Sequence, residues 1–249
     1  MATILTDCRL FTGGCDLTGV NNKVELGAEV EEKDVTTFRA DGTTDRLYKE
    51  VIGGIASSAI SAEGFWEAGD PGKVDDALWA QQGGLTGWTI APDTADVGDP
   101  AYLTKAMQGS YGLLGAVGDV APWKAEASGS WPLVRGQIAH PPGTARTADG
   151  AGTAVQALAV PAGGFVYAAL HVLSVAGTAA PTITVSVESD VDDTFGSPAT
   201  VLSFAAASAV GGQILRAPGP VTDTWYRVAW TITGTAPSFL FVAAFGVSV

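Results

Sequence analysis

Apolar and polar side chains alternate along several stretches of the chain with the period of two that is typical of β-strands. The clearest run lies in residues 22–38, where Val24, Leu26, Ala28 and Val30 alternate with charged or small residues. This pattern predicts a long strand with one dry and one wet face.

Shorter strands are expected on both sides of this run. Residues 3–12 predict a first strand in which Ile4 and Leu5 supply apolar contacts. Residues 86–91 predict another. Residues 101–117 have a composition compatible with a helix, but three glycines within them favour a strand with bends.

Residues 57–84 predict a strand, a tight turn, one helix and a stop. Asp70 is the expected N-cap, Pro71 suits the first helical position, and Gly83 with Gly84 ends the helix. One face of the helix, expected near residues 71–82, is apolar at helical spacing and is formed by Val74, Ala77 and Leu78. We expect this helix to pack on a sheet.

Proline, glycine, threonine and alanine are concentrated without any period in residues 140–152. We therefore predict a β domain over 1–140, a linker over 141–152 and a second β domain over 153–249. The second half is predicted to be a sandwich or jelly roll. Its expected strands cover residues 165–175, 182–188, 201–204, 224–233 and 238–249.

The composition adds an acidic surface to this all-β prediction. The 249 residues carry a formal charge of −13, and the lysines and arginines form no run. Such a surface repels phosphate and disfavours direct capture of nucleic acid. The N-terminus does not resemble a signal peptide, and no apolar run approaches the length of a membrane helix, so a soluble protein made in a cytoplasm is expected.

The two cysteines, Cys8 and Cys15, do not have the spacing of a zinc site. Two thiols in a reducing compartment are favoured, and a disulfide that closes a small loop is the alternative.

Residues with candidate chemistry are few, and the chain has no motif of a known catalytic class. We expect no enzyme and no cofactor. His140 is placed in the linker, and His171 in an apolar strand as a core or interface histidine. Asp190, Asp192 and Asp193 are weak candidates for calcium ligands, but an acidic turn is the preferred interpretation. Most of the seven tryptophans are expected in the core.

Two glutamates invite a comparison with glycosidases. Glu63 and Glu67 lie four residues apart on an expected strand and hence on one face. No aromatic platform accompanies them, so carboxylates that face water are preferred.

Three segments of the first half resemble the major tail, or tail tube, proteins of long-tailed bacteriophages of actinobacteria. They are DLTGVNNKVEL (Asp16–Leu26), KDVTTF (Lys33–Phe38) and SAEGFWEAGD (Ser61–Asp70), the last leading into the helix. The resemblance covers about residues 1–138 and implies packed antiparallel sheets with a flanking helix. It implies a structural virion protein that joins copies of itself, edge to edge, into stacked rings.

The resemblance also implies roles for particular residues. Glu25, Glu29, Glu63 and Glu67 are expected to line an acidic bore through which DNA passes without sticking. The sequence itself, which has no steady period in residues 39–50, leaves this segment as either a solvated hairpin loop or an arm that becomes ordered on a neighbouring subunit. The candidate contact residues in this loop are Arg39, Asp41, Asp45, Arg46 and Tyr48.

The implied partners are copies of the chain and other tail proteins such as the tip, terminator and tape measure. Rings would be hexamers, or trimers with pseudo-sixfold symmetry if both halves are tube-type domains. A virion tail assembled in the host cytoplasm and away from any membrane is the expected location. A carbohydrate-binding β-sandwich, secreted or attached to a virion, remains the alternative.

Overall fold

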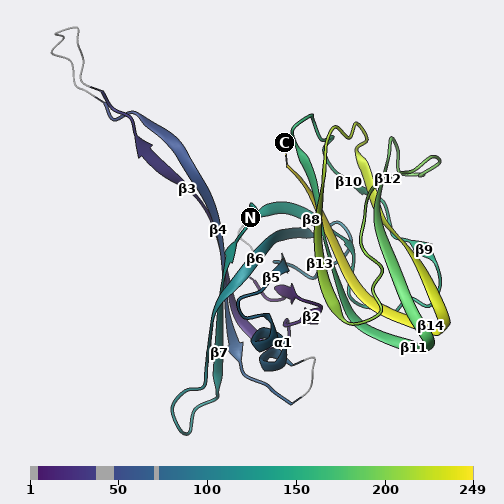
Figure 1. Cartoon of the computed structure of the whole chain (residues 1–249), viewed down its shortest axis with the longest axis horizontal. Coiled ribbons are helices and arrows are strands. Elements are labelled where there is room, and N and C mark those ends of the chain that lie inside the picture. The colour runs from purple at the N-terminus through teal and green to yellow at the C-terminus, as the bar shows by residue number, and fades with distance from the viewer. Residues whose placement is uncertain (1–4, 38–47, 70–72, 249) are drawn as a thin grey trace.

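The structure, a computed structural model, describes residues 5–37, 48–69 and 73–248. All strand pairings in this part of the chain are antiparallel, and a single helix accompanies them (Figure 1). This confirms the prediction of an all-β fold with one helix. The strands of the first half are β1 (Arg9–Thr12), β2 (Cys15–Asp16), β3 (Asn21–Asp34), β4 (Val51–Phe65), β5 (Leu85–Ala91), β6 (Pro100–Leu113), β7 (Pro122–Gly129) and β8 (Val134–His140). Those of the second half are β9 (Gly150–Ala151), β10 (Val155–Gln156), β11 (Phe165–Asp190), β12 (Ala199–Ser203), β13 (Gly211–Pro218) and β14 (Trp225–Ser248).

The first half is organised around β6, a long strand that pairs with β5 along one edge and with β7 and β8 along the other. Strand β7 continues to β4, and β4 continues to β3, which gives a four-stranded sheet in the order β3-β4-β7-β6. Strands β5 and β1 pack across one face of this sheet, where Trp88, Trp123 and Ile60 share one buried cluster. The first strand starts at Arg9, later than expected, and Leu5 is exposed.

The helix α1 (Val74–Gln81) closes this cluster, with Val74 and Leu78 fully buried as expected. Two side chains of β6 hold it there. Gln108 Nε2 donates to the Leu78 carbonyl at 2.9 Å, and the Tyr111 hydroxyl donates to Asp75 at 3.0 Å.

The ends of the helix agree only in part with the sequence prediction. The N-cap is Lys73, which makes no capping side-chain bond, whereas the expected Asp70 and Pro71 lie outside the described residues. The stop is confirmed, because Gly83 has a φ of +76° that glycine adopts at little cost.

The second half is built on β11 and β14, which have 26 and 24 residues and stay paired almost from end to end. The sequence predicted two separate strands for each of them. Both instead bend in the middle, around Gly177 and Gly234, and fold the ladder back on itself. Val166 and Val185 thereby meet in one core, as a sandwich requires. The alternating pattern of apolar and polar residues stops at the bend, which explains why the sequence predicted two strands where each of β11 and β14 is one.

The bend contains alanines in the left-handed region, where a Cβ is unfavourable. Ala236 has a φ of 47° and is exposed. Ala236→Gly is expected to raise the free energy of unfolding by up to about 1 kcal/mol, measured by urea denaturation. Ala199→Gly, at an exposed position of β12, is the matched control and should lower it by about 0.5–1 kcal/mol. Equal effects would contradict the assignment of strain to the bend.

The boundary between the halves carries paired backbone. Strand β8 pairs with β6 on one side and with β14 on the other. Within residues 141–152, β9 pairs with β14, and Arg146 forms a bridge with Phe239. The placement of His140 in a linker is wrong, because it is the last residue of β8 and is buried.

Candidate assembly surface

One face of the sheet β3-β4-β7-β6 carries a lattice of opposite charges. Lys23 Nζ lies 3.1 Å from Glu25 and 3.8 Å from Glu63, and Lys124 Nζ lies 2.7 Å from Glu126. The hydrogen bond with Glu25 raises the pKa of Lys23, and the one with Glu126 raises the pKa of Lys124. The lattice is exposed, so these pairs set surface charge rather than stability.

The structure brings together three of the four glutamates that were predicted to line a bore. Glu25 and Glu29 have the same parity in β3, and Glu25 lies two residues along from Lys23, the cross-strand partner of Glu63. Glu67 is a correction: β4 ends at Phe65, so Glu67 is not on this strand and instead bonds Lys73 at 2.7 Å.

Sequence reasoning did not place Lys23, Lys124 and Glu126 in this lattice. Lys124 and Glu126 alternate with apolar residues along the chain, but strand order is needed to see that β7 lies beside β4. With these residues included, the face holds four glutamates and two lysines and is only mildly acidic.

Beyond the body of the protein, β3 and β4 continue as a two-stranded arm (Figure 1). We define the arm as residues 28–37 and 48–57. All its strand residues are exposed, including Val30 (59% exposed) and Ile52 (56% exposed). The core covers the expected apolar face of β3 at Leu26, but farther along the strand the same face is exposed to water. This happens because β7 pairs with β4 only from Ala59 onward.

The predicted subunit-contact residues fall in the sequence between and beside the two strands of the arm. Tyr48 is described and exposed, whereas Arg39, Asp41, Asp45 and Arg46 lie outside the described residues. Two ion pairs lie along the arm, Lys33 with Glu31 and Lys49 with Glu32. A two-stranded ribbon of this kind is only marginally stable when nothing covers it.

The four-stranded sheet has a free border along β3 and a short one at the end of β6. In the described part of the chain, β3 pairs only with β4. Strand β6 loses its β5 partner after Met107, and the Gln108 carbonyl accepts the Gly83 N–H at 2.9 Å, so only its described residues after Gln108 have no strand or turn bonded on that side. Exposed edges of this length promote pairing with another chain.

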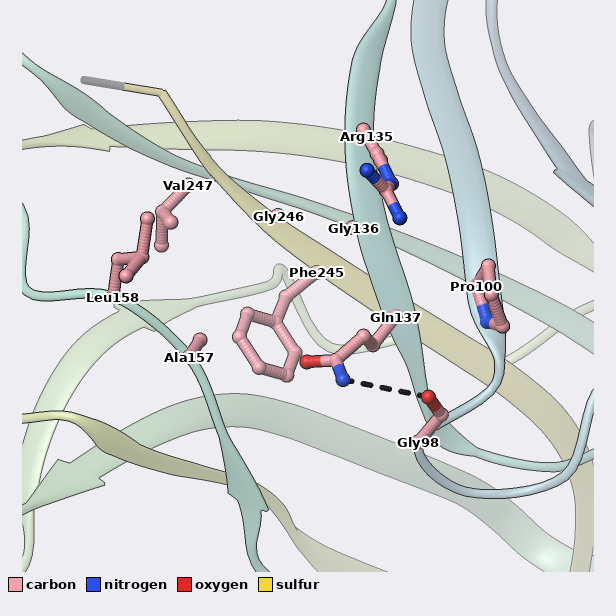
Figure 2. A pocket seen from close by; sticks show the side chains of 10 residues that line it. All are labelled: Gly98, Pro100, Arg135, Gly136, Gln137, Ala157, Leu158, Phe245, Gly246 and Val247. Carbon is pink, nitrogen blue, oxygen red and sulfur yellow. Dashed lines mark hydrogen bonds between the residues drawn. The ribbon is translucent and has the colours of Figure 1, made fainter.

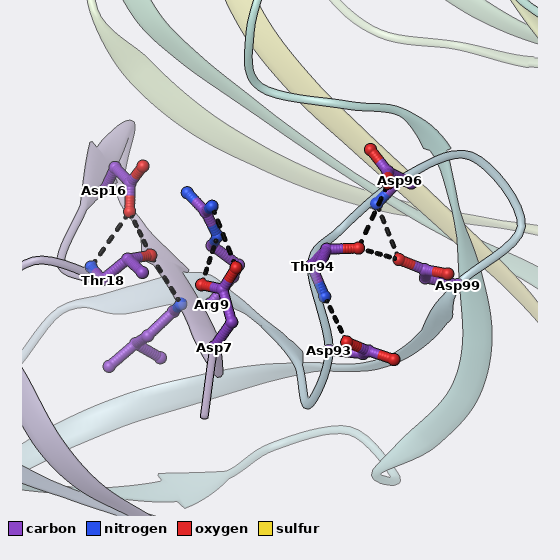
Figure 3. Close-up of polar contacts among 9 residues, drawn as sticks. Asp7, Arg9, Asp16, Thr18, Asp93, Thr94, Asp96 and Asp99 are labelled. Atoms are coloured by element: carbon purple, nitrogen blue, oxygen red, sulfur yellow. Dashed lines mark hydrogen bonds and ion pairs between the residues drawn. The ribbon is translucent and has the colours of Figure 1, made fainter. Parts of the chain in front are cut away.

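The acidic turns elsewhere on the surface are satisfied by their own backbone. In the β5–β6 loop the Thr94 hydroxyl and the Asp96 N–H both donate to Asp99 at 2.8 Å, and Asp16 accepts the Thr18 N–H in the same way (Figure 3). These are Asx-type turns that fix loop shape.

The weak calcium candidates form a turn of the same kind. Asp190 accepts the N–H groups of Val191 and Ser197, and Asp192 accepts that of Thr194. Among the described residues, no three acidic, histidine or cysteine side chains are grouped to hold a metal ion.

The hollow beside the β8–β14 seam is small, with a volume of about 290 Å³ (Figure 2). Gln137 Nε2 donates to the Gly98 carbonyl at 3.4 Å, and Phe245 and Leu158 supply apolar walls. Arg135 is the one charged side chain among the described lining residues. This combination offers neither an acid–base pair nor a nucleophile.

The histidines and cysteines are buried or half-buried within the fold. His171 lies in a core, as expected, with Nε2 2.9 Å from the Thr89 hydroxyl, and burial lowers its pKa to about 3. Burial and Arg146 lower the pKa of His140 to about 4. Cys8 and Cys15 are not joined by a disulfide, and burial raises the pKa of Cys15 to about 11.

The tryptophans are divided between core and surface. Trp88, Trp123 and Trp230 are buried, as expected for core residues, whereas Trp79 is exposed on α1. The other three are half-buried and comprise Trp66, Trp131 and Trp225.

The fold and these surfaces define a class: an all-β protein with a projecting arm, free sheet borders and a charged outer face. The described part of the chain has no helix that is long and apolar enough to span a bilayer. No family model matches the sequence, and no curated protein matches it.

Similar solved structures exist at low identity. One is the tail of an empty gene transfer agent particle refined with C6 symmetry, with 18% identity, a TM-score of 0.38, and coverage of 51% of this chain and 92% of that chain. Another is the virion of a native gene transfer agent particle, with 18% identity, a TM-score of 0.41, and coverage of 53% and 97%. A third is the Dit protein of phage SPP1, described as a hub adsorption apparatus, with 8% identity, a TM-score of 0.33, and coverage of 98% and 100%. These neighbours are components of phage tails or of gene transfer agent particles.

Proposed function

We propose that this chain is a structural protein of a phage tail that assembles with copies of itself into stacked rings around a DNA channel. The observation that carries the proposal is the arm, in which a two-stranded ribbon exposes Val30 and Ile52 to water. An isolated ribbon is marginal, and apolar residues held on it are best explained by a protein surface that covers them.

The free borders of the sheet β3-β4-β7-β6 support ring closure. The β3 edge of one copy and the residues of β6 beyond Gln108 in the next copy offer unpaired backbone groups at opposite sides of the same sheet. Pairing them head to tail makes a closed ring if the rotation between copies closes.

The charged face suits the inner wall of such a ring. Four glutamates and two lysines leave the wall mildly negative, so phosphate is repelled over a short range and is not bound. Of the four glutamates predicted from the sequence, Glu25, Glu29 and Glu63 are the proposed bore residues, and Glu126 is added to them. No membrane or cofactor enters this function.

The alternative of a carbohydrate-binding protein gains no support from the sites it requires. Trp88, Trp123 and Trp230 are buried rather than presented to a sugar, and Trp79 is the one tryptophan classed as exposed among the described residues. Asp190 and Asp192 are occupied by the N–H groups of their own turn.

The proposal is tested by sedimentation and electron microscopy of the full chain as a function of concentration. Burial of two such side chains is worth about 3 kcal/mol or more, so the double variant Val30→Lys, Ile52→Lys should raise the concentration needed for assembly about a hundredfold or more. Val191→Lys changes a still more exposed apolar residue of the second half (73% exposed) and should assemble like wild type.

A wild-type chain that stays monomeric at high concentration, even with a nucleating tip present, would refute the proposal. Where rings form, the number of subunits separates a hexamer from a trimer with pseudo-sixfold symmetry. The same images would show whether residues 153–249 lie in the wall or outside it.

A further inference from the structure

An aromatic and cationic cluster lies where the two halves meet and is not used by the ring proposal. It consists of Lys105, Trp131, Phe165, Tyr167 and Arg216, which we call the Trp131 cluster. Lys105 Nζ lies 5.4 Å from the Trp131 ring centroid, and the Arg216 guanidinium carbon lies 5.2 Å from the same centroid. Arg216 also lies 4.7 Å from the centre of Phe165.

The ring that carries the two cations is held firmly in place. The Trp131 carbonyl accepts hydrogen bonds from the hydroxyls of Ser58 and Thr104, both at 2.9 Å. Tyr167 meets the indole edge-on, with 5.7 Å between the ring centres. A preorganised aromatic ring with cations against it is typical of a binding surface, because little side-chain freedom is lost on contact.

The two cations of the cluster have no carboxylate partner within the described part of the chain, unlike most of its lysines. The described basic residues Lys23, Lys33 and Lys124 all lie within ion-pair distance of a carboxylate. Lys105 and Arg216 form no ion pair with any carboxylate in the described ranges. Stacking on a ring face leaves the N–H groups of a cation available to an acidic partner.

The arm has the complementary chemistry. Apart from the proposed bore residue Glu29, its described residues carry four carboxylates against two lysines, together with the exposed Val30 and Ile52. The carboxylates are those of Glu31, Glu32, Asp34 and Glu50. The arm extends away from the β11–β14 sandwich, which supplies part of the cluster (Figure 1). Carboxylates of the arm that reach a Trp131 cluster must therefore come from another molecule.

We propose that the Trp131 cluster receives the acidic arm of a second copy of this chain. The carboxylates of the arm pair with Lys105 and Arg216, and its apolar side chains cover Trp131 and Phe165. This inference rests on the proposed self-assembly and adds the receiving site to it.

Arg216→Glu tests the contact in the full chain, and Arg135→Glu is the matched control. Both arginines are exposed and form no ion pair with a described carboxylate, and both changes alter the charge by two. At about 0.1 M salt, Arg216→Glu should raise the assembly concentration about tenfold or more over the control. Arg216→Lys keeps the positive charge and should assemble at nearly the wild-type concentration. Combining Arg216→Glu with Glu32→Arg and Glu50→Arg should return most of the assembly that Arg216→Glu alone loses.

The outcomes separate this inference from the function on which it rests. If wild type assembles and Arg216→Glu assembles at the same concentration as Arg135→Glu, the receiving site is refuted while the ring proposal stands. If wild type never assembles, both fail. Fluorescence anisotropy with a labelled single-stranded 20-mer is the second measurement. Binding by wild type that Arg216→Glu abolishes would assign the cluster to nucleic acid and overturn the inference.

Discussion

Replacing Gly136 with alanine is expected to lower the free energy of unfolding by about 3 kcal/mol or more. A Cβ at this position would lie 2.0 Å from the Phe245 carbonyl oxygen and 2.7 Å from the Gly246 Cα. Strand β14 cannot retreat, because its other edge pairs with β11 and Phe245 is fully buried. The clash must therefore open the β8–β14 pairing that joins the two halves.

Urea denaturation followed by tryptophan fluorescence measures this effect. Gly143→Ala is the matched control, since a Cβ there meets nothing within 4 Å, and it should leave stability within about 0.5 kcal/mol of wild type. Equal stability of the two variants would show that the Phe245 carbonyl does not approach Gly136 closely enough to exclude a Cβ. A calorimetric scan of Gly136→Ala also tests the division at residues 141–152, since two transitions indicate separate domains and one indicates a single cooperative unit.

The strands that alternate over one covered face could be predicted from the sequence. The run in residues 22–38 forms a strand as far as Asp34, and the run in 182–188 lies within β11. In 182–188 the period-two pattern reports one-sided burial, as expected. Strand β13 was missed, since Gly211–Pro218 has no such alternation and gains its place from pairing with β11. Strand β8 was missed as well, and its paired position between β6 and β14 explains why His140 is buried.

The candidate surfaces were less predictable because they depend on strand order. Parity along one strand correctly placed Glu25 and Glu29 on a common face. It failed at Glu67, since the end of β4 is set by the turn that follows and not by the pattern. The Trp131 cluster draws on β6, β11, β13 and the residues after β7, so no local signal could have found it.

Acidification below pH 6.5 is expected to destabilise the folded chain because of its two buried histidines. Burial lowers the pKa of His171 to about 3, and burial with Arg146 lowers that of His140 to about 4. In the unfolded chain both titrate near 6.5, so the unfolded state binds more protons below that pH. Their contribution to stability is therefore complete above pH 6.5 and is lost as the pH falls toward 4.

Each histidine should contribute a slope of about 1.4 kcal/mol per pH unit between pH 6 and 4.5, or a combined loss of about 4 kcal/mol at pH 5. Urea midpoints of the full chain at pH 5.0–7.5 measure it. His171→Gln removes one titrating group and should roughly halve the slope, whatever its effect on stability at pH 7.5. A stability that is level from pH 7 to pH 5 would contradict the burial of neutral imidazoles. A slope unchanged in His171→Gln would assign the acid sensitivity to other groups.

Because His140 bonds the Phe241 carbonyl of β14 and Arg146 of the connecting segment, its protonation is expected to loosen the junction between the halves first.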